Sequence, residues 1–261
     1  MKKIKFTKMV ASGNDFVVID KNPGGNLAAL ARVLCDRKFG VGADGLLLVE
    51  KVKNADLRMH IFNADGSEAD MCGNGARCVA LFSGRKKAKL ITPAGVINSQ
   101  VNGSKVKIQL TDPKRIDLDI PLKVNGPLIN VNFINTGVPH VVVFVDRLDQ
   151  IDVAGIGRLI RRHARFSPAG TNVNFVEIKD GNLIQIRTYE RGVEDETLAC
   201  GTGSTAAALI FALKSNLVNL VNVRTQSGEI LKVYFNNKEG KFKNVWLEGS
   251  ARIVYKGEYH V

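Results

Sequence analysis

One short motif occurs in both halves of the chain. Cys72-Gly73-Asn74-Gly75 lies in the first half and Cys200-Gly201-Thr202-Gly203 in the second, 128 positions apart (200 − 72 = 128) in a chain of 261 residues. This separation indicates an internal duplication, and its period is far longer than the roughly 20 to 50 residues of solenoid repeats. We therefore expect each copy to form a domain of its own rather than one layer of a stack.

Other segments repeat at nearly the same offset. Small loop insertions account for the drift of a few residues between one pair and the next. The matched pairs are 13–18 with 137–142, 46–50 with 173–177, Asn63 with Glu190, and 92–95 with 225–228. We therefore place the two predicted domains at residues 1–122 and 123–250.

The hydrophobic pattern predicts the same order of elements in each half. In the first half we expect strands at 4–10 and 16–20, a helix at 26–37 with an asparagine cap, strands at 46–51 and 57–63, a helix at 74–82, and strands at 96–101 and 106–110. In the second half we expect strands at 131–134 and 140–146, a helix at 156–165, strands at 172–179 and 183–190, a helix at 203–214, and strands at 230–235 and 245–247. The predicted fold class is α/β (α+β), with two pseudo-symmetric domains that each curl a mixed β-sheet around a central apolar helix.

No segment of the sequence predicts export or a membrane anchor. Residues 1–13 are basic but lack a following apolar stretch, and the longest apolar run, 205–213, is too short to span a bilayer. The four cysteines are too few for a disulfide framework in a chain of this length, and a reducing compartment keeps them as thiols. We expect a cytoplasmic protein with no membrane partner.

The formal net charge of +12 raises the question of a nucleic-acid partner. The basic residues are scattered, with small clusters only at 85–87 and 161–162, and no aromatic residues alternate with them to form a stacking surface. We therefore expect no nucleic-acid partner. Attraction of an anionic substrate remains open as a milder consequence of the charge.

Both repeated cysteines stand where a helix is predicted to begin. The predicted helix that follows Cys200 is apolar on every face between 206 and 213, which is typical of a helix buried all round. Backbone N–H groups and the helix dipole at such a terminus favour a thiolate, so we expect lowered thiol pKa values. The flanking glycines let those amides approach an anion closely, and a substrate carboxylate is an obvious candidate.

Simpler roles account for only some of the four cysteines. The spacing from Cys72 to Cys78 is not a usual metal pattern and has no nearby histidine, so a zinc site is disfavoured. Burial as small apolar side chains suits Cys35 and Cys78, which fall within predicted helices. It does not explain two cysteines at matched, glycine-flanked helix starts. The turns also lack the ending of a phosphate-binding P-loop.

Six motifs in order resemble the diaminopimelate epimerase family, and they span nearly the whole chain. They are GNDF at 13–16, GVGADG at 40–45, NADGSEADMCGNGARC at 63–78, TGVPH at 136–140, GTNVNFV at 170–176 and YERGVEDETLACGTGSTA at 189–206. The resemblance implies two pseudo-symmetric α/β domains with the active site in the cleft between them. It also implies that the last strand crosses back, which adds residues 251–261 to the first domain.

The resemblance implies a chemistry as well. Inverting an amino-acid α-carbon requires removing a proton from one face and delivering one to the other, and two opposed thiols perform this as base and acid. By resemblance the reaction interconverts LL- and meso-diaminopimelate, in lysine and peptidoglycan precursor biosynthesis, with no cofactor and no metal. The substrate is then the small-molecule partner, and a homodimer is usual in the family.

The site residues follow from the resemblance, position by position. Cys72 and Cys200 match the catalytic pair, and His140 and Glu190 match the residues that tune it. Substrate contacts are implied for Asn14, Asn63, Gly73, Asn74, Gly75, Asn172, Glu190, Arg191, Gly201 and Thr202. Taken singly, Asn14 and Asn63 would equally suit turns, His140 a turn after Pro139, and Arg191 a solvated surface.

Two positions depart from the commonest pattern of the family. Val138 stands where many members have asparagine, and Gly45 stands where some have glutamine, which removes two polar side chains from the expected substrate pocket. A proline or hydroxyproline racemase-type enzyme of the same architecture is the nearest alternative. A non-catalytic binding protein or a phenazine-synthesis-type isomerase is a further one, and retention of both Cys72 and Cys200 speaks against it.

Overall fold

The computed structural model describes residues 3–260, which divide into two compact units. The first runs to Gln109 and takes in the chain again from Gly249, and the second comprises Leu110–Glu248. The boundary therefore falls before the predicted one at 122/123. The reason is that Ile116–Lys123, which the hydrophobic pattern did not predict as a strand, pairs with Leu128–Asn135 in the second unit.

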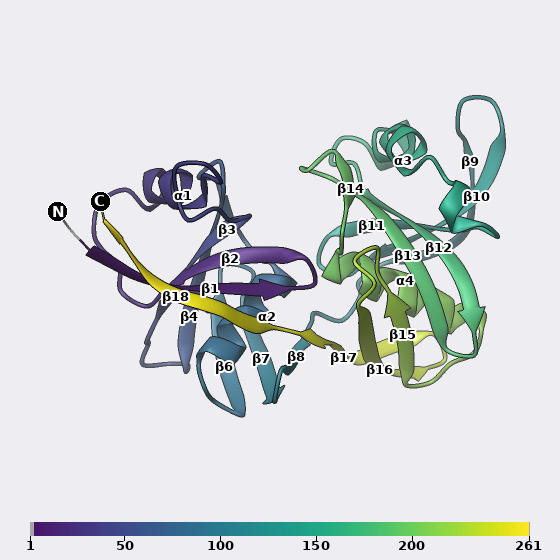
Figure 1. Ribbon diagram of the computed structural model, residues 1–261. Coiled ribbons are helices and arrows are strands. Elements are labelled where there is room, and N and C mark those ends of the chain that lie inside the picture. The colour runs from purple at the N-terminus through teal and green to yellow at the C-terminus, as the bar shows by residue number, and fades with distance from the viewer. Residues whose placement is uncertain (1–2, 261) are drawn as a thin grey trace. The chain divides into compact units, whose positions relative to one another are not determined.

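The first unit contains two helices, α1 and α2, among strands (Figure 1). Its elements are β1 (Lys3–Ala11), β2 (Asn14–Ile19), α1 (Leu27–Cys35), β3 (Gly45–Glu50), β4 (Leu57–Asn63), β5 (Glu68–Ala69), α2 (Gly73–Phe82), β6 (Lys87–Thr92), β7 (Gly95–Asn102), β8 (Lys105–Gln109) and β18 (Arg252–His260). The predicted asparagine cap is present, because the Asn26 side chain accepts a hydrogen bond from Ala29 N at the start of α1.

The second unit contains helices α3 and α4. Its elements are β9 (Ile116–Lys123), β10 (Leu128–Asn135), β11 (Pro139–Phe144), the short 3-10 helix Leu148–Gln150, α3 (Val153–Arg161), a second 3-10 turn at Ala164–Phe166, β12 (Asn172–Asp180), β13 (Leu183–Glu190), β14 (Asp195–Thr197), α4 (Gly201–Lys214), β15 (Leu220–Arg224) and β16 (Ile230–Lys238). β17 (Lys241–Ser250) follows and leads the chain back to the first unit.

Helix α3 differs from its predicted range of 156–165. It begins three residues earlier because the Asp152 side chain accepts from Gly155 N and caps it. It ends at Arg161, and His163 starts a separate 3-10 turn by accepting from Arg165 N.

The strand pairings of the two units follow one pattern. In the first, β1/β2 is antiparallel, β2/β3 parallel, β3/β4 antiparallel, β4/β6 parallel, and β6/β7 and β7/β8 antiparallel. In the second, β10/β11, β11/β12, β12/β13, β13/β15, β15/β16 and β16/β17 repeat these senses in the same order. Even the extra strands correspond, since β18 pairs antiparallel with β1 as β9 does with β10. The duplication seen in the sequence is therefore a duplication of topology.

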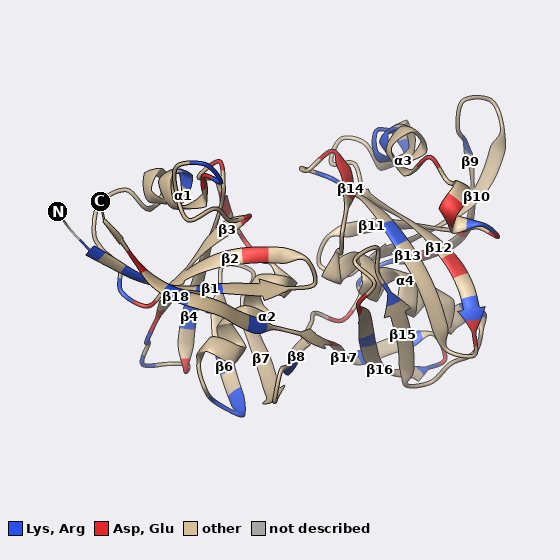
Figure 2. Cartoon of the chain, in the orientation of Figure 1, with Lys and Arg blue, Asp and Glu red and all other residues tan. Residues whose placement is uncertain are grey.

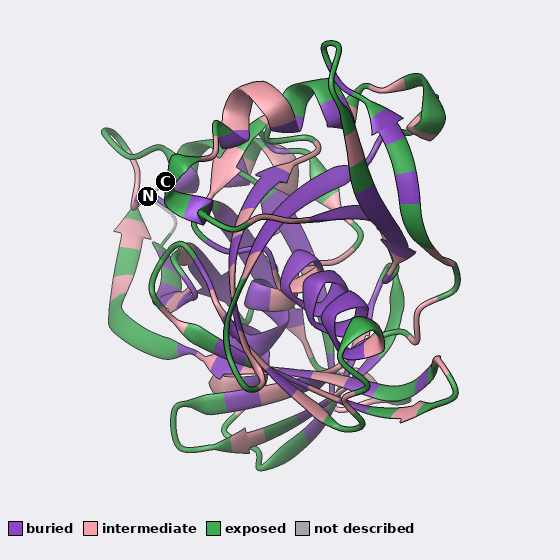
Figure 3. Cartoon of the chain, turned by 90° about the vertical axis from the view of Figure 1, so that its right-hand side faces the viewer, coloured by how far each residue is buried: buried purple, intermediate pink, exposed green. Residues whose placement is uncertain are grey.

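One helix of each unit is buried against its strands. In α2 the run from Asn74 to Ala80 is buried, and in α4 the run from Gly203 to Ala212 is buried. Figure 3 shows α4 as the purple helix enclosed by strands. The prediction of a central apolar helix is thus confirmed for α4. Because this helix is packed on all sides, its first turn, which begins directly after Cys200, has a fixed place in the unit.

Charged residues occur along the strands and loops of both units, with Lys and Arg interspersed among Asp and Glu (Figure 2). Among residues 3–260, no helix combines the length and apolar character that a membrane span requires.

Candidate active site

Cys72 and Cys200 occupy the same position at the start of a buried helix. Cys72 is the N-cap of α2 and Cys200 that of α4, and both have extended backbone angles. Each sulfur accepts a hydrogen bond from the backbone N–H three residues on, Gly75 or Gly203, at 3.4 Å. The matched motif therefore builds two equivalent caps, each of which holds a thiol at a helix N-terminus.

Glycine at the third helical residue is required by packing. A Cβ on Gly75 would lie 3.2 Å from Leu47 Cδ2, and one on Gly203 would lie 2.4 Å from Asn174 Oδ1. Neither helix start can therefore accept a side chain there without moving its neighbours.

In the first unit the predicted residues are Asn14, Asn63 and 72–75, which we call the first cysteine cluster. Asn14, at the start of β2, accepts a hydrogen bond at Oδ1 from Asn74 Nδ2 at 2.6 Å. Asn63, at the end of β4, donates from Nδ2 to Ser67 Oγ at 2.9 Å. The structure thus joins two of the predicted substrate contacts, and Asn63 is held by its own turn.

In the second unit the predicted residues are His140, Asn172, Glu190, Arg191 and 200–202, which we call the second cysteine cluster. Glu190 ends β13 and lies beside Cys200, with which it hydrogen-bonds. Its Oε1 also accepts from Thr197 Oγ1 at 2.5 Å. Burial raises the pKa of Glu190, although the bonds with Thr197 and Cys200 act in the opposite direction.

The expected lowering of the thiol pKa is not found at Cys200. Burial raises the pKa of this thiol well above its usual value, and the negative charge of Glu190 raises it further. Hydrogen bonds with Thr202 and from Gly203 N oppose the shift, as a helix N-terminus should, but they are outweighed. Cys200 is only 8% exposed, and a short sequence motif does not show how deeply its cysteine will be buried. Cys200 is therefore a protonated thiol at neutral pH.

His140 is completely buried in β11, and this decides its protonation. Burial lowers the pKa of the imidazole to about 3, and the charge of Arg191 contributes. Asn174 Nδ2 donates to the Val141 carbonyl at 2.9 Å and lies 3.2 Å from His140 Nδ1. Because a carbonyl only accepts, that nitrogen is the amide donor, and Nδ1 is then the acceptor. The neutral ring carries its proton on Nε2, which has no hydrogen-bond partner among the described residues.

Asn172 links the strand of His140 to Arg191. It donates from Nδ2 to the Pro139 carbonyl at 3.2 Å and accepts at Oδ1 from Arg191 N at 2.8 Å. The Arg191 guanidinium donates to the Ala169 carbonyl at 3.1 Å. Arg191 also lines a cavity of about 300 Å³ within the second unit. The other side chains of this cavity that carry charge or amide groups are Arg115, Asp117, Asn135 and Arg165.

The remaining predicted residues are helix-start amides. Gly73 and Gly201 are the first residues of α2 and α4. Thr202 hydroxyl lies 3.5 Å from the Cys200 sulfur, and the Thr202 carbonyl accepts from Thr136 Oγ1 at 3.3 Å. Among the described residues, no group of three or more His, Cys, Asp or Glu side chains is placed to hold a metal ion.

Sequence reasoning missed two polar residues that hold the second cysteine cluster. Asn174 orients His140, and Thr197 donates to Glu190. Asn174 had a detectable signal, because Asn172 and Asn174 alternate with the apolar Val173 and Phe175 and so share one face of the strand. Thr197 had none, because its contact depends on the pairing of β13 with β14.

Comparison with known proteins gives a consistent result. A model of the diaminopimelate epimerase family matches residues 6–116 and 132–254. The diaminopimelate epimerase of Aquifex aeolicus (strain VF5) is 44% identical over 97% of each chain, and that of Methanocella arvoryzae is 39% identical over 100% of this chain and 98% of its own.

Solved structures of lower identity share the fold. A PhzF-family phenazine biosynthesis protein from Bacillus anthracis has a TM-score of 0.77 at 18% identity over the full length of both chains. A hydroxyproline epimerase from Agrobacterium vitis has a TM-score of 0.71 at 16% identity, covering 98% of this chain and 92% of that one. These likenesses show the fold alone, with its two-domain α/β architecture.

Proposed function

Because the chain belongs to the diaminopimelate epimerase family, it is an isomerase that interconverts LL- and meso-diaminopimelate, and we propose that Cys72 and Cys200 are its acid–base pair. The observation that carries this proposal is the equivalence of the two caps. Both sulfurs accept from the third N–H of a buried helix at the same distance, so the same chemistry can be performed from either one.

The reaction needs the α-carbon of the substrate between the two sulfurs. One thiolate removes the α-proton, and the other thiol delivers its proton to the opposite face, so the protonation states of the two cysteines are exchanged in each turnover. The carbanion is stabilised by charge spreading into the α-carboxylate. The N–H groups at 73–75 and at 201–202 each lie at a helix N-terminus, and a helix N-terminus is suited to bind such a carboxylate.

Cys200 starts as the proton donor in this scheme. Burial and Glu190 hold its thiol protonated, as the raised pKa shows. In the reverse direction Cys200 has to act as the base, and Glu190 is the adjacent group that can accept its proton. A raised carboxyl pKa makes Glu190 a better match for that transfer. His140 remains neutral and offers an N–H from Nε2 as a donor.

The distal end of the substrate suits Arg191. Diaminopimelate carries a second carboxylate, and a guanidinium binds a carboxylate through two parallel hydrogen bonds. Asn172 fixes the backbone of Arg191, which positions this side chain at its cavity. Asn14 and Asn63 complete the proposed set of substrate contacts. Val138 and Gly45 supply no polar side chain, so the distal end depends more heavily on Arg191.

A proline or hydroxyproline racemase function is less well supported. Solved structures of that kind share the fold at 16–18% identity, whereas relatives named diaminopimelate epimerase are 38–44% identical over nearly the full chain. Proline also has no second carboxylate to occupy Arg191. The proposal extends to a homodimer in the cytoplasm that needs no metal or organic cofactor, and gel filtration with light scattering tests the assembly.

The decisive experiment is α-proton exchange in D2O, followed by NMR with LL-diaminopimelate and, in parallel, with proline. We expect deuterium at the α-position of diaminopimelate only. Cys72→Ala and Cys200→Ala should each lower turnover by about 10³-fold or more, because each removes the acid or base of one face. Cys35→Ala is the matched control, since Cys35 is also a buried thiol but lies in α1.

Two results would count against the proposal. Exchange into proline would move the substrate assignment to the racemase class. Retention of epimerisation in either cysteine variant, at the level of Cys35→Ala, would remove that thiol from the acid–base pair while leaving the family and the fold in place.

A further inference from the structure

Two side-chain amides of the first cysteine cluster lie between a cation and a carboxylate. The buried guanidinium of Arg77, in α2, donates to Asn74 Oδ1. Asn74 Nδ2 donates to Asn14 Oδ1 at 2.6 Å, and Asn14 Nδ2 donates in turn to Asp44 Oδ2 at 2.9 Å. The chain of hydrogen bonds therefore runs in one direction, from cation to amide to amide to carboxylate.

The two ends of this chain allow only that direction. A guanidinium has donors and no acceptor, and an ionised carboxylate has acceptors and no donor. Turning the Asn74 amide over would place donor against donor at Arg77 and acceptor against acceptor at Asn14. Turning the Asn14 amide over would place donor against donor at Asn74 and acceptor against acceptor at Asp44. Each wrong orientation therefore loses two hydrogen bonds, one of them to a charged group.

Both ends are themselves held firmly. Arg77 is 0% exposed, and its guanidinium also donates to Ser12 Oγ at 2.8 Å and to the Ser250 carbonyl at 3.3 Å. Asp44 accepts from Arg37 at 2.7 Å and from the backbone N–H of Asp15 at 3.2 Å.

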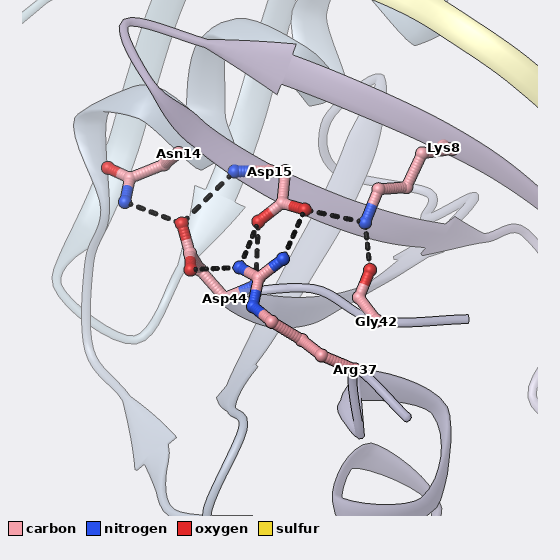
Figure 4. A network of polar contacts seen from close by, with 6 residues as sticks. All are labelled: Lys8, Asn14, Asp15, Arg37, Gly42 and Asp44. Atoms are coloured by element: carbon pink, nitrogen blue, oxygen red, sulfur yellow. Dashed lines mark hydrogen bonds and ion pairs between the residues drawn. The ribbon is translucent and has the colours of Figure 1, made fainter. Parts of the chain in front are cut away.

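Figure 4 shows the Asp44 end of the chain, where Arg37 bridges two carboxylates. Arg37 binds Asp15 with two nitrogens, at 3.2 and 2.8 Å, and Lys8 binds the same carboxylate at 2.7 Å. These cations hold the pKa of Asp15 at about 2, although burial acts to raise it. Asp15 and Asp44 therefore stay in place as one charged group around Arg37.

We propose that Arg77 and Asp44 are positioning residues that fix which way the amides of Asn14 and Asn74 face the substrate. Each amide uses one N–H and one oxygen lone pair within the chain, so one N–H and one lone pair of each remain for a ligand. With the direction fixed, those groups keep their places through the catalytic cycle. The inference rests on the proposed function, because it assigns a role toward diaminopimelate.

The test reverses the polarity of one end. Asp44→Lys places a donor against Asn14 Nδ2 while Arg77 remains at the other end, so one bond of the chain must break. We expect KM for diaminopimelate to rise about tenfold with kcat within about threefold, since one hydrogen bond that serves binding is lost. Asp44→Asn keeps an oxygen for Asn14, and its KM should stay within about threefold of wild type.

Asp56 provides a matched control in the same unit. Like Asp44, it accepts from one arginine, Arg85, and from one backbone N–H, that of Lys89 at 2.8 Å. Its side chain is 29% exposed, against 39% for Asp44. Asp56→Lys thus changes the net charge by the same amount as Asp44→Lys, but at a residue that does not bond to either amide. We expect its KM to stay within about twofold of wild type.

The Arg77 end gives an independent measurement. Arg77→Lys retains a donor-only group and should keep KM closer to wild type than Arg77→Gln, which can face Asn74 either way. Should these buried variants fail to fold, the KM values of Asp44→Lys, Asp44→Asn and Asp56→Lys are sufficient to test the inference. Equal KM in Asp44→Lys and Asp56→Lys would overturn the inference. Absence of epimerisation in the wild-type protein would instead overturn the proposed function, so the two failures are distinguishable.

Discussion

The two cysteine clusters share a cap and differ in what surrounds the sulfur. Cys200 is buried beside a carboxyl, Glu190, whereas Cys72 is half-buried, and the counterpart of Glu190 is the neutral Asn63. The backbone arrangement is the same in both copies, and in each a glycine at the third helical residue packs closely against a neighbouring side chain. The side chains around it have diverged, so that a carboxyl, Glu190, lies beside the sulfur in the second cluster, whereas two hydrogen-bonded amides, Asn14 and Asn74, lie in the first.

Among the predictions that test this difference between the clusters, the largest effect is expected at Glu190 and its counterpart Asn63. Glu190→Gln preserves size and an acceptor for Thr197 but removes the carboxylate that we propose accepts a proton from Cys200. We expect kcat to fall about 100-fold, within the usual range for a lost acid or base. Asn63→Ala should act mainly on KM, because Asn63 is neutral and its proposed role is to bind the substrate. Steady-state kinetics in both directions checks this, and a comparable kcat loss in both variants would erase the proposed distinction between the clusters.

Thiol alkylation sharpens the same comparison. Iodoacetamide reacts with thiolates, and burial together with Glu190 raises the pKa of Cys200. Cys72 should therefore be modified at least about tenfold faster than Cys200 at pH 8. Peptide mass spectrometry follows each site separately, and buried Cys78 serves as the slow reference. Equal rates at Cys72 and Cys200 would contradict the protonated resting state of Cys200.

Acid stability should report on His140. Its pKa is lowered to about 3 in the folded protein, so the unfolded chain binds more protons between about pH 6.5 and 3. The contribution of His140 to the free energy of unfolding is therefore fully present above the unfolded value and is lost as pH falls toward 3. Urea unfolding at several pH values should show a shallower decline for His140→Gln. A slope identical to that of wild type would mean that the imidazole is not held neutral.

The smallest expected effect is at Thr197. Thr197→Val removes only the hydroxyl that donates to Glu190 and keeps the shape of the side chain. We expect kcat to fall about threefold to tenfold, the range of one hydrogen bond to a polar group. Thr205→Val is a suitable control, because the Thr205 hydroxyl donates within α4 to the Gly201 carbonyl. A larger loss at Thr205 than at Thr197 would speak against a role for the Glu190 contact.

The sequence predicts those parts of the site that depend on local chain geometry. Cys72 and Cys200 were placed at helix starts because glycine-rich turns and apolar helices are visible as patterns. The direction of the Cys200 pKa shift was wrong because it depends on burial, which neighbouring strands create. Likewise the contact of Asn174 with His140 joins two parallel strands, and the chain from Arg77 to Asp44 joins residues far apart in sequence. The alternation in β12 marks Asn174 as a polar residue on one face, but which residue it contacts depends on strand pairing that no local pattern reveals.

The pairing of β18 with β1 has a consequence for the order of synthesis. The second unit is continuous between Leu110 and Glu248, whereas the first lacks a strand until the residues after Glu248 have been made. At translation rates of about 5–20 residues per second, β1 waits on the order of 10 s with an open edge while the second unit is made. The unit that is begun first is thus completed after the second, and the growing chain must keep β1 from pairing elsewhere until β18 emerges.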